Sequence, residues 1–271
     1  MQDIPIPDRM PELDVAIEAA VRAGESILEI YRGDFESYKK SDDSPVTDAD
    51  LESNRIIKGI LGTGHAILSE EDTDSKSRLS SGTVWIVDPL DGTSDFVDRT
   101  GEFTVMIALV QDGSPVLGVI GWPTEGKLFV AQKGRGAFRW SGKWDRISVT
   151  QTVDPARCRA IGSRHHLSDA DRSFIKSLGM SFASIGSSLK VARISSGEAE
   201  AYITTTNKMK EWDTAASYCI ITEAGGKMTD MNGGHLVYNK ADVIHHDGIL
   251  VTNGAIHDII LSEFKKKSRK Y

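Results

Sequence analysis

The residues of this sequence best suited to chemistry are two aspartates that follow a short apolar run. Asp88 and Asp91 lie in residues 85–93, which read WIVDPLDGT. We expect a strand to end at Asp88, because Pro89 has no N–H group to donate to a sheet. Asp91 and Gly92 then favour a sharp turn, on which two carboxylates three residues apart can converge on one point.

The residues after this turn favour the start of a helix. Thr93 and Ser94 are typical of a helix N-terminus, where free N–H groups attract phosphate. Carboxylates beside such amides make electrostatic sense only if cations lie between them. The segment therefore predicts a site for cations and phosphate together.

Other acidic residues occupy comparable places. Glu70 follows the apolar run 66–68, and Asp213 lies where a helix is expected to begin. Asp48 and Asp50 precede another expected helix. Each of these alone is typical of a helix start or a turn, but together they predict a cluster.

Four converging carboxylates, those of Glu70, Asp88, Asp91 and Asp213, would need a countercharge. Each like pair at ~4 Å would cost on the order of 1–4 kcal/mol in aqueous to surface-like surroundings, and without compensation some would take up protons. Two Mg²⁺ ions would cancel this charge, and ligands made of oxygen alone fit that hard cation better than zinc. A phosphate bridging the ions would then be hydrolysed in a two-metal displacement.

Hydrophobic periodicity predicts the elements that position these residues. A first helix is expected over residues 11–31, and a second ends near Leu61. The residues expected to be buried on the second helix are Leu51, Ile56, Ile57 and Ile60. Strands are expected at residues 66–68, 84–87, 103–110, 116–122, 127–131, 137–140 and 146–149.

After residue 150 the predicted strands and helices alternate. The strands are 159–163, 181–185, 199–204, 227–229 and 249–252, and the helices are 168–178, 187–196, 212–224 and a final C-terminal helix. Residues 1–271 are therefore expected to form one unit with two subdomains. Residues 1–149 would be α+β and carry the metal site, and residues 150–271 would be α/β and form the substrate side.

The motifs as a group resemble the inositol monophosphatase superfamily of lithium-sensitive, magnesium-dependent phosphatases. The resemblance covers nearly the whole chain. It is carried by Asp88-Pro89-Leu90-Asp91-Gly92-Thr93 with Phe96, by Trp212-Asp213 before Thr214-Ala215-Ala216, and by Glu70-Glu71. It implies a layered αβαβα sandwich.

The resemblance also implies roles for individual residues. The implied metal ligands are Glu70, Asp88, the carbonyl of Leu90, Asp91 and Asp213. Glu70 and Thr93 would activate the attacking water. Asp50 and Lys40 (or Lys39) would border a third, weaker metal position, giving two or three Mg²⁺ ions per site.

Three segments are most similar to the 3'(2'),5'-bisphosphate nucleotidases: residues 101–105 (GEFTV), 163–166 (SRHH) and 186–190 (GSSLK). The similarity implies conversion of adenosine 3',5'-bisphosphate to AMP, as part of sulfur metabolism. Ser94-Asp95 departs from the Lys-Glu pair usual at that position, which bears on the substrate and not on the metal site. The expected substrate contacts are Gly92, Thr93, Ser187, Lys190, Asp213, Arg164 and Lys40.

The residues alone leave alternatives open. Residues 186–188 could offer amides and hydroxyls at a helix start, with Lys190 as a cation for a second phosphate, or they could form a capped helix with a solvated lysine. The same chemistry could serve inositol 1-phosphate, histidinol phosphate or a sugar phosphate. A non-catalytic regulator that binds metal or nucleotide is a further alternative of another class.

Composition limits the partners. The net charge of -7 gives no overall attraction to nucleic acid polymers or anionic membranes. The absence of an apolar window of ~20 residues and of a leader-like pattern in residues 1–11 argues against membrane insertion and export. We therefore expect a cytoplasmic monomer or homodimer acting on a small phosphate ester. The basic tail 265–270 would be a solvated helix end, or a peripheral contact with the inner membrane.

Cysteine and histidine do not suggest another metal. Cys158 and Cys219 have no metal-ligand spacing and are expected to be buried, reduced thiols. The pairs at 165–166 and 245–246 lack the spacing of zinc ligands. They are expected to be surface-loop histidines, with His165 as a possible substrate contact.

Overall fold

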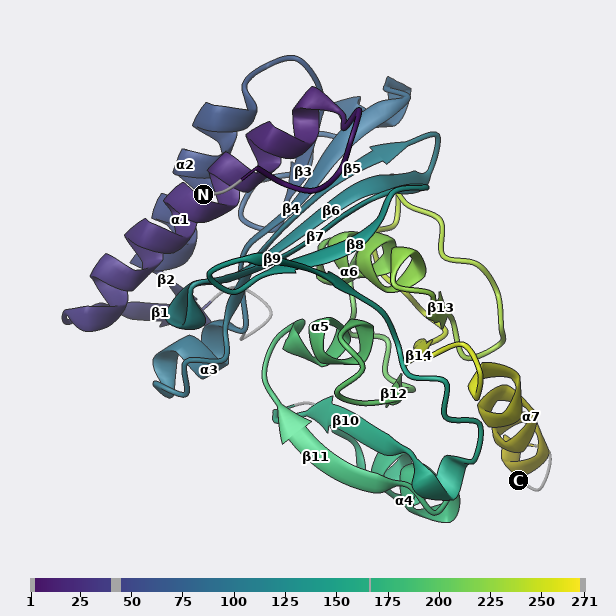
Figure 1. Cartoon of the computed structure of the whole chain (residues 1–271). Helices are drawn as coiled ribbons and strands as arrows, with labels where there is room; N and C mark the ends of the chain where they lie inside the picture. Colours follow the sequence, from purple (N-terminus) through teal and green to yellow (C-terminus); the bar gives the residue numbers. More distant parts are fainter. Residues whose placement is uncertain (1–2, 40–44, 166, 269–271) are drawn as a thin grey trace.

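The computed structural model describes residues 3–39, 45–165 and 167–268 (Figure 1). The N-terminal helices α1 (Pro11–Arg32) and α2 (Asp48–Leu61) lie side by side on one face of a large sheet. The buried side of α1 includes Leu13, Ala20 and Ile27, spaced about two turns apart, so one apolar stripe faces the sheet.

The large sheet has seven strands in the order β3-β4-β5-β6-β7-β8-β9. β3 is parallel to β4, and each following neighbour pair is antiparallel. The bounds are β3 Ala66–Ser69, β4 Thr83–Asp91, β5 Thr104–Gln111, β6 Ser114–Trp122, β7 Lys127–Gln132, β8 Gly136–Trp140 and β9 Trp144–Ile147.

Alternate residues of this sheet enter different cores. In β5, Val105, Ile107 and Leu109 pack with α1 and α2. Met106 and Val110 belong to the core on the opposite face, which contains α5 and α6. This period of two shows that both faces of the sheet are covered by helices.

The opposite face is covered by α5 (Leu189–Ser195) and α6 (Glu211–Glu223), which separate the large sheet from a second sheet (Figure 1). The second sheet has five strands in the order β11-β10-β12-β14-β13. The bounds are β10 Arg159–Ser163, β11 Ser181–Ile185, β12 Ala201–Thr204, β13 Lys227–Thr229 and β14 Ile249–Thr252.

The outer face of the second sheet is covered by α4 (Asp169–Ser177) and α7 (His257–Ser268). Phe174 of α4 and Ile260 of α7 share a core with Ile203 of β12. The layers therefore run helix, sheet, helix, sheet, helix, and the predicted αβαβα sandwich is confirmed. The remaining short elements are β1 Ser37–Lys39, β2 Pro45–Thr47, α3 Thr93–Val97, η1 Ser77–Ser80, η2 Pro123–Glu125 and η3 Pro155–Arg157.

The α6 helix lies unusually close to β6. A Cβ atom added to Gly118 of β6 would lie 2.5 Å from the carbonyl oxygen of Ala216 of α6. Only a residue without a side chain allows this approach. The position of α6, and of the residues at its N-terminus, is therefore fixed directly by the sheet.

Several predicted details are wrong. Leu51 is 51% exposed, because the buried side of α2 runs through Ala49, Ser53 and Ile57. Strand β4 does not stop at Asp88 but continues to Asp91, with an irregularity in its pairing to β5 across Pro89. An irregularity of this kind tolerates proline, because the missing N–H group is not needed there.

Several other elements also differ from the predictions, by one or two residues. The last strand of the large sheet is 144–147 rather than 146–149, and α5 begins at Leu189 rather than at residue 187. β12 covers 201–204 rather than 199–204. Both cysteines are buried and free, as expected. Within 3–39, 45–165 and 167–268, no helix combines the length and apolarity needed to cross a bilayer.

Candidate metal centre and active site

The period of strand β4 directs Asp88 toward α6. Val84 and Ile86 belong to the core that contains α6, whereas Trp85 and Val87 belong to the core under α1 and α2. Asp88 continues the first series, and it pairs in register with Met106, which is in the same core as Val84. The Asp88 side chain is buried, with 1% exposed.

The irregular stretch after Asp88 shapes the rest of the loop. The amide of Leu90 donates to Asp88 Oδ1 at 3.1 Å, so the aspartate braces its own turn. Gly92 follows with φ +92°, in the left-handed region, and caps α3. An added Cβ there would also lie 3.0 Å from the Cβ of Ser187 and 3.1 Å from the carbonyl of Glu102, so the position requires glycine on both counts.

Asp213 reaches the same place from the other half of the chain. It is the third residue of α6, and its carboxylate accepts a hydrogen bond from the backbone N–H of Lys210. This capping geometry fixes the side chain at the helix start. Because α6 packs directly on the large sheet, Asp213 is held beside the end of β4.

Three of the predicted ligands form a tight group. Carboxylate oxygens of Asp88, Asp91 and Asp213 all lie within 4.8 Å of one another. Glu70 is outside this group, but it lines the same cavity. Its backbone N–H donates to the carbonyl of Val87 at 3.2 Å, which holds the end of β3 beside the end of β4.

The carboxylates of this group resist ionisation together. Burial, followed by the charge of Glu70, raises the pKa of Asp88 well above its ordinary value. Burial and the charges of Glu70 and Asp91 raise the pKa of Asp213 to about 8. The pKa of Asp91 is also raised by burial, although Lys190 and a hydrogen bond from Ser188 oppose the shift.

This donor set fits a hard divalent cation. Every candidate ligand offers oxygen: the carboxylates of Glu70, Asp88, Asp91 and Asp213, and the Leu90 carbonyl, which lies in the irregular part of β4. The raised pKa values mean that the surrounding protein does not fully balance the negative charge. Cations bound among these oxygens would supply the missing balance.

Thr93 and Asp50 form a second feature of the site. The Thr93 hydroxyl lies 2.9 Å from Asp50 Oδ1 and 3.2 Å from the Leu90 carbonyl. Asp50 Oδ2 accepts from both the amide and the hydroxyl of Thr47, at 2.7 and 2.6 Å. Asp50 thus caps α2 with one oxygen and holds Thr93 with the other.

The carboxylate cluster opens into a cavity of about 660 Å³. Its wall on the side of the second sheet includes Ser187, Lys190 and Tyr202. Ser187 has φ +46°, and the Ser188 amide donates to Asp91 Oδ2, so the start of α5 is attached to the end of β4.

Lys190 is an almost buried cation in this wall. Its ammonium donates to the carbonyl of Ser187 and lies 5.4 Å from the ring centre of Tyr202. Burial lowers the pKa of Lys190, while the charges of Asp91 and Asp95 oppose the shift. A buried cation facing a cavity is available to an anionic group of a ligand.

A network of charges joins α3 to the second sheet. Arg164 donates to Asp95 at 3.2 Å and to Glu102 at 2.5 Å, and His165 Nε2 lies 3.3 Å from the other oxygen of Asp95. The amide of Gly186 also donates to Glu102. The network therefore ties the loops of the second sheet to the segment that carries Thr93.

The cavity is lined by nearly all of the predicted site residues. They are Glu70, Asp88, Leu90, Asp91, Gly92, Thr93, Ser187, Lys190 and Asp213. Arg164 is instead engaged with Asp95 and Glu102. Lys40 and His166 lie outside the described residues, and Lys39 is an exposed residue at the end of β1.

Several neighbours of the site were missed from the sequence. Asp95 is buried, and Tyr202 lines the cavity. The sequence predicted a strand over 199–204 but no role for Tyr202 in the site. His245 was expected in a surface loop but is buried, and its Nε2 lies 2.8 Å from the Thr214 hydroxyl. Its pKa is lowered by burial to about 4, so it is neutral.

Known proteins agree with this architecture. The profile of the inositol monophosphatase family matches residues 8–269. The 3'(2'),5'-bisphosphate nucleotidase CysQ of Salmonella typhimurium is 36% identical over 247 residues, which cover 89% of this chain and 99% of that protein. The histidinol-phosphatase of Chlorobaculum parvum is 30% identical over 261 residues, covering 91% and 93%.

A solved structure leads to the same family. The crystal structure of CysQ from Bacteroides thetaiotaomicron, described as a bacterial member of the inositol monophosphatase family, superposes with a TM-score of 0.80. That protein is 35% identical, and the match covers 90% of this chain and 97% of the other. The resemblance predicted from the motifs is confirmed: this chain belongs to the inositol monophosphatase family.

Proposed function

We propose that this protein is a magnesium-dependent 3'(2'),5'-bisphosphate nucleotidase that converts adenosine 3',5'-bisphosphate to AMP and phosphate. As a family member with CysQ relatives, the chain is a metal-dependent phosphatase. The observation that carries the substrate assignment is a buried cation, Lys190, in the wall of the cavity that contains the carboxylate cluster. Relatives named as bisphosphate nucleotidases support the same choice.

The proposed metal ligands are Glu70, Asp88, the Leu90 carbonyl, Asp91 and Asp213. Two or three Mg²⁺ ions fit a site that offers oxygen ligands only. When bound, such ions stabilise negative charge on the attacking and leaving oxygens of a phosphate ester. The protein contributes the placement of these ligands at the ends of β3 and β4 and at the start of α6.

Thr93 and Glu70 are proposed to prepare the attacking water. Because the Thr93 hydroxyl can donate its hydrogen to Asp50, its oxygen is left to accept a hydrogen bond from a water molecule. Glu70 lines the same cavity and can accept the other proton of that water. Asp50 would keep Thr93 in this orientation and would also border the third, weaker metal position.

The wall of the second sheet is proposed to bind the rest of the nucleotide. Lys190 and the hydroxyl of Ser187 would receive the phosphate that is not hydrolysed. Gly92 and Asp213 would contact the sugar side of the ester. Arg164 would act through its pairs with Asp95 and Glu102, and Lys40 remains a predicted contact.

The wider properties stay predictions. We propose that residues 1–149 and 150–271 work as one unit. The first part would carry the metal ligands other than Asp213, and the second would supply Asp213 and the substrate side. A cytoplasmic location, a monomer or homodimer, lithium inhibition and a role in sulfur metabolism follow the same proposal. No described residue gives evidence for a membrane contact by the basic tail.

Histidinol phosphate is the second candidate substrate. It is supported by the histidinol-phosphatase of Chlorobaculum parvum, which is 30% identical to this chain. Both candidates use the same metal chemistry, and they differ in the second phosphate. A substrate with one phosphate leaves Lys190 without an anionic partner from the ligand.

A substrate panel tests the proposal. Phosphate release would be measured at fixed Mg²⁺ for adenosine 3',5'-bisphosphate, inositol 1-phosphate and histidinol phosphate. We expect the highest kcat/KM for the bisphosphate and loss of all activity after chelation. A higher kcat/KM for either monophosphate would reject the nucleotidase assignment, and turnover that survives chelation would reject the metal centre.

A further inference from the structure

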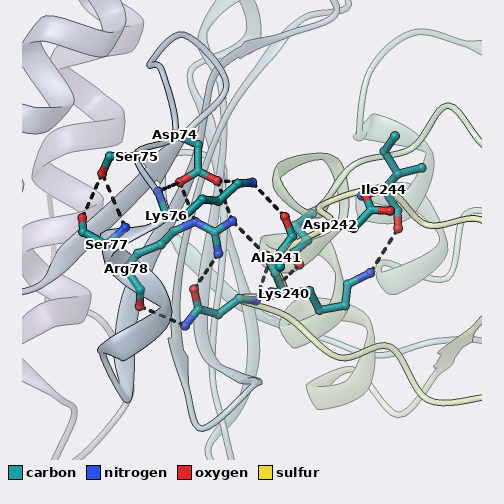
Figure 2. A network of polar contacts seen from close by, with 11 residues as sticks. Asp74, Ser75, Lys76, Ser77, Arg78, Lys240, Ala241, Asp242 and Ile244 are labelled. Atoms are coloured by element: carbon teal, nitrogen blue, oxygen red, sulfur yellow. Dashed lines mark hydrogen bonds and ion pairs between the residues drawn. The ribbon is translucent and has the colours of Figure 1, made fainter.

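A buried arginine lies outside the cavity, between the segment that follows Glu70 and a loop of the second half of the chain. The Arg78 side chain is only 3% exposed. Its guanidinium donates to both oxygens of Asp74, at 3.2 and 2.7 Å. Figure 2 shows it directed from η1 toward residues 240–244.

The other donors of Arg78 bind that second segment. Nη1 donates to Asn239 Oδ1 at 2.7 Å, and Nη2 donates to the Lys240 carbonyl at 2.9 Å. The side-chain amide of Asn239 (Nδ2) in turn donates to the backbone carbonyls of Arg78 and Ser81, each at 3.3 Å. Lys76 adds a bond from its ammonium to the Ala241 carbonyl (Figure 2).

The segment held in this way carries the buried carboxylate of Glu211. The backbone amides of Asn239 and Lys240 donate to the two oxygens of the Glu211 carboxylate, at 2.7 and 2.9 Å. Glu211 is fully buried, so these two amides supply hydrogen bonds that its carboxylate cannot obtain from water. Adjacent amides can meet both oxygens of one carboxylate only while the turn at Asn239, with φ +59°, is maintained.

Glu211 is the first residue of α6, two residues before Asp213. The same loop pairs with the chain that enters the helix: the Glu211 amide donates to the Val243 carbonyl at 2.9 Å, and the His245 amide donates to the Met209 carbonyl at 2.9 Å. Residues 209–211, which lead into α6, are therefore hydrogen-bonded to the same loop that Arg78 binds.

Arg78 is also linked to the other side of the metal centre. It follows Glu70 by eight residues in the segment that leaves β3. Within that segment, Asp72 accepts hydrogen bonds from Asn54 and Lys58 of α2, at 2.9 and 2.6 Å. The segment is thus fixed to the first half of the chain at Asp72 and to the second half at Arg78.

We propose that Arg78 is a positioning residue of the metal centre, which sets Asp213 relative to Glu70 by fixing the loop 239–244 to η1. The inference rests on the proposed metal centre, since it concerns the distance between two of its ligands. The planar guanidinium supplies donors in fixed directions, and Arg78 uses them for four hydrogen bonds to a carboxylate, an amide oxygen and a carbonyl. An ammonium has only three donors, and their directions are not fixed in one plane. Groups behind metal ligands that orient them typically change metal affinity 10–100-fold when removed.

The test is to titrate the full-length protein with Mg²⁺ in the absence of substrate and to measure the binding by calorimetry. We expect Arg78→Met to weaken Mg²⁺ binding by about tenfold or more. Arg78→Lys keeps the positive charge but not the planar set of donors. Its Mg²⁺ affinity should therefore lie between those of the parent and Arg78→Met. Hydrogen exchange of the amides at 211–214 in the metal-free protein should be faster in Arg78→Met.

Arg159→Met is a control for the loss of an arginine that binds a buried carboxylate, although the Arg159 side chain itself is 53% exposed. Arg159 also binds both oxygens of a buried carboxylate, Glu200, at 3.3 and 3.0 Å, and a backbone carbonyl, that of Gly197. It lies at the opposite end of β10 from Ser163, which lines the cavity. We expect this variant to lower the Tm and to leave the Mg²⁺ affinity within about twofold of the parent.

A second variant tests the same contact in case Arg78→Met does not fold. Asn239→Gly removes the oxygen that accepts from Arg78 but keeps a residue that tolerates φ +59°. It should weaken Mg²⁺ binding in the same direction.

Equal Mg²⁺ affinities for the parent, Arg78→Met (or Arg78→Lys) and Asn239→Gly would overturn the positioning role and leave the proposed function intact. A parent protein that does not bind Mg²⁺ would instead overturn the metal centre itself, and the inference with it.

Discussion

The Thr93 hydroxyl lies 2.9 Å from the Asp50 carboxylate, although the two residues are 43 positions apart in the chain. Asp50 is fixed in turn by the amide and hydroxyl of Thr47 at the start of α2. A helix cap thereby sets the direction of a hydroxyl at the end of the large sheet. The orientation of this hydroxyl depends on the packing of α2 against β4.

Thr93→Val should lower kcat for the preferred phosphate ester by about 100-fold or more, because the proposed acceptor for the attacking water is removed while the volume is kept. Thr93→Ser retains the hydroxyl and should recover most of the activity. Mg²⁺ affinity, measured by calorimetry, should change little in either variant. A Thr93→Val enzyme with parental kcat would show that this hydroxyl does not orient the water.

The stability of the metal-free protein should fall as pH rises. Burial and nearby carboxylates raise the pKa of Asp213 to about 8 in the folded state, against ~3.9 in an unfolded chain. The folded protein therefore holds a proton that the unfolded chain releases, and this contribution is complete below pH ~4 and lost as pH rises through about 8.

Thermal melts in chelator between pH 5 and 8.5 would show this effect as a difference between the parent and Asp213→Asn. We expect the Tm of the parent to decline more steeply with pH than that of the variant. Saturating Mg²⁺ should remove most of the difference in slope, because bound cations stabilise the ionised carboxylate. Identical slopes in chelator would contradict the raised pKa.

Lys190→Met should discriminate between substrates with one and two phosphates. Loss of a charged hydrogen bond of ~1.5–3 kcal/mol corresponds to a roughly 10–100-fold fall in kcat/KM for adenosine 3',5'-bisphosphate. A substrate with a single phosphate should be much less affected. Steady-state kinetics on both kinds of substrate gives the ratio, and an equal loss for both would mean that Lys190 serves only the metal side through Asp91.

Gly118→Ala should destabilise the protein by about 1–3 kcal/mol, because the added Cβ would lie 2.5 Å from the Ala216 carbonyl and force α6 away from β6. Gly59→Ala is the matched control. Gly59 lies within α2, and an added Cβ there meets no atom within 4 Å, so that substitution should be neutral or stabilising by up to ~1 kcal/mol. Urea unfolding of both variants measures the difference, and similar midpoints would argue against the tight contact of α6.

The sequence predicted those parts of the structure that repeat locally. The apolar stripe of α1 and the alternation in β5 follow directly from the periods of helix and strand. The convergence of Asp88, Asp91 and Asp213 could be anticipated because each motif is specific. The continuation of β4 beyond Pro89 could not be anticipated, because a strand tolerates proline only where the pairing with its neighbour leaves the N–H group unused.

The supporting contacts were beyond reach of the sequence. Arg78 lies in a polar stretch, SKSRLSS at residues 75–81, which is typical of an exposed loop. Its burial arises from partners more than 160 residues away, Asn239 and Lys240. Leu51 shows the reverse error, because an apolar residue on a helix was assigned to the core although the neighbouring layer covers a different face.

The division of the cavity between two sheets has a consequence for changing the enzyme's selectivity. Most of the proposed acidic metal ligands are supplied by β3, β4 and the turns after them, whereas the opposing wall is supplied by α5 and the strands around it. Exchanging residues 181–195 for the equivalent stretch of a relative with another substrate would leave the acidic residues of β3, β4 and the following turns in place. Such chimeras offer a route to new specificities with the hydrolytic apparatus retained, provided that the bond from Ser188 to Asp91 is preserved.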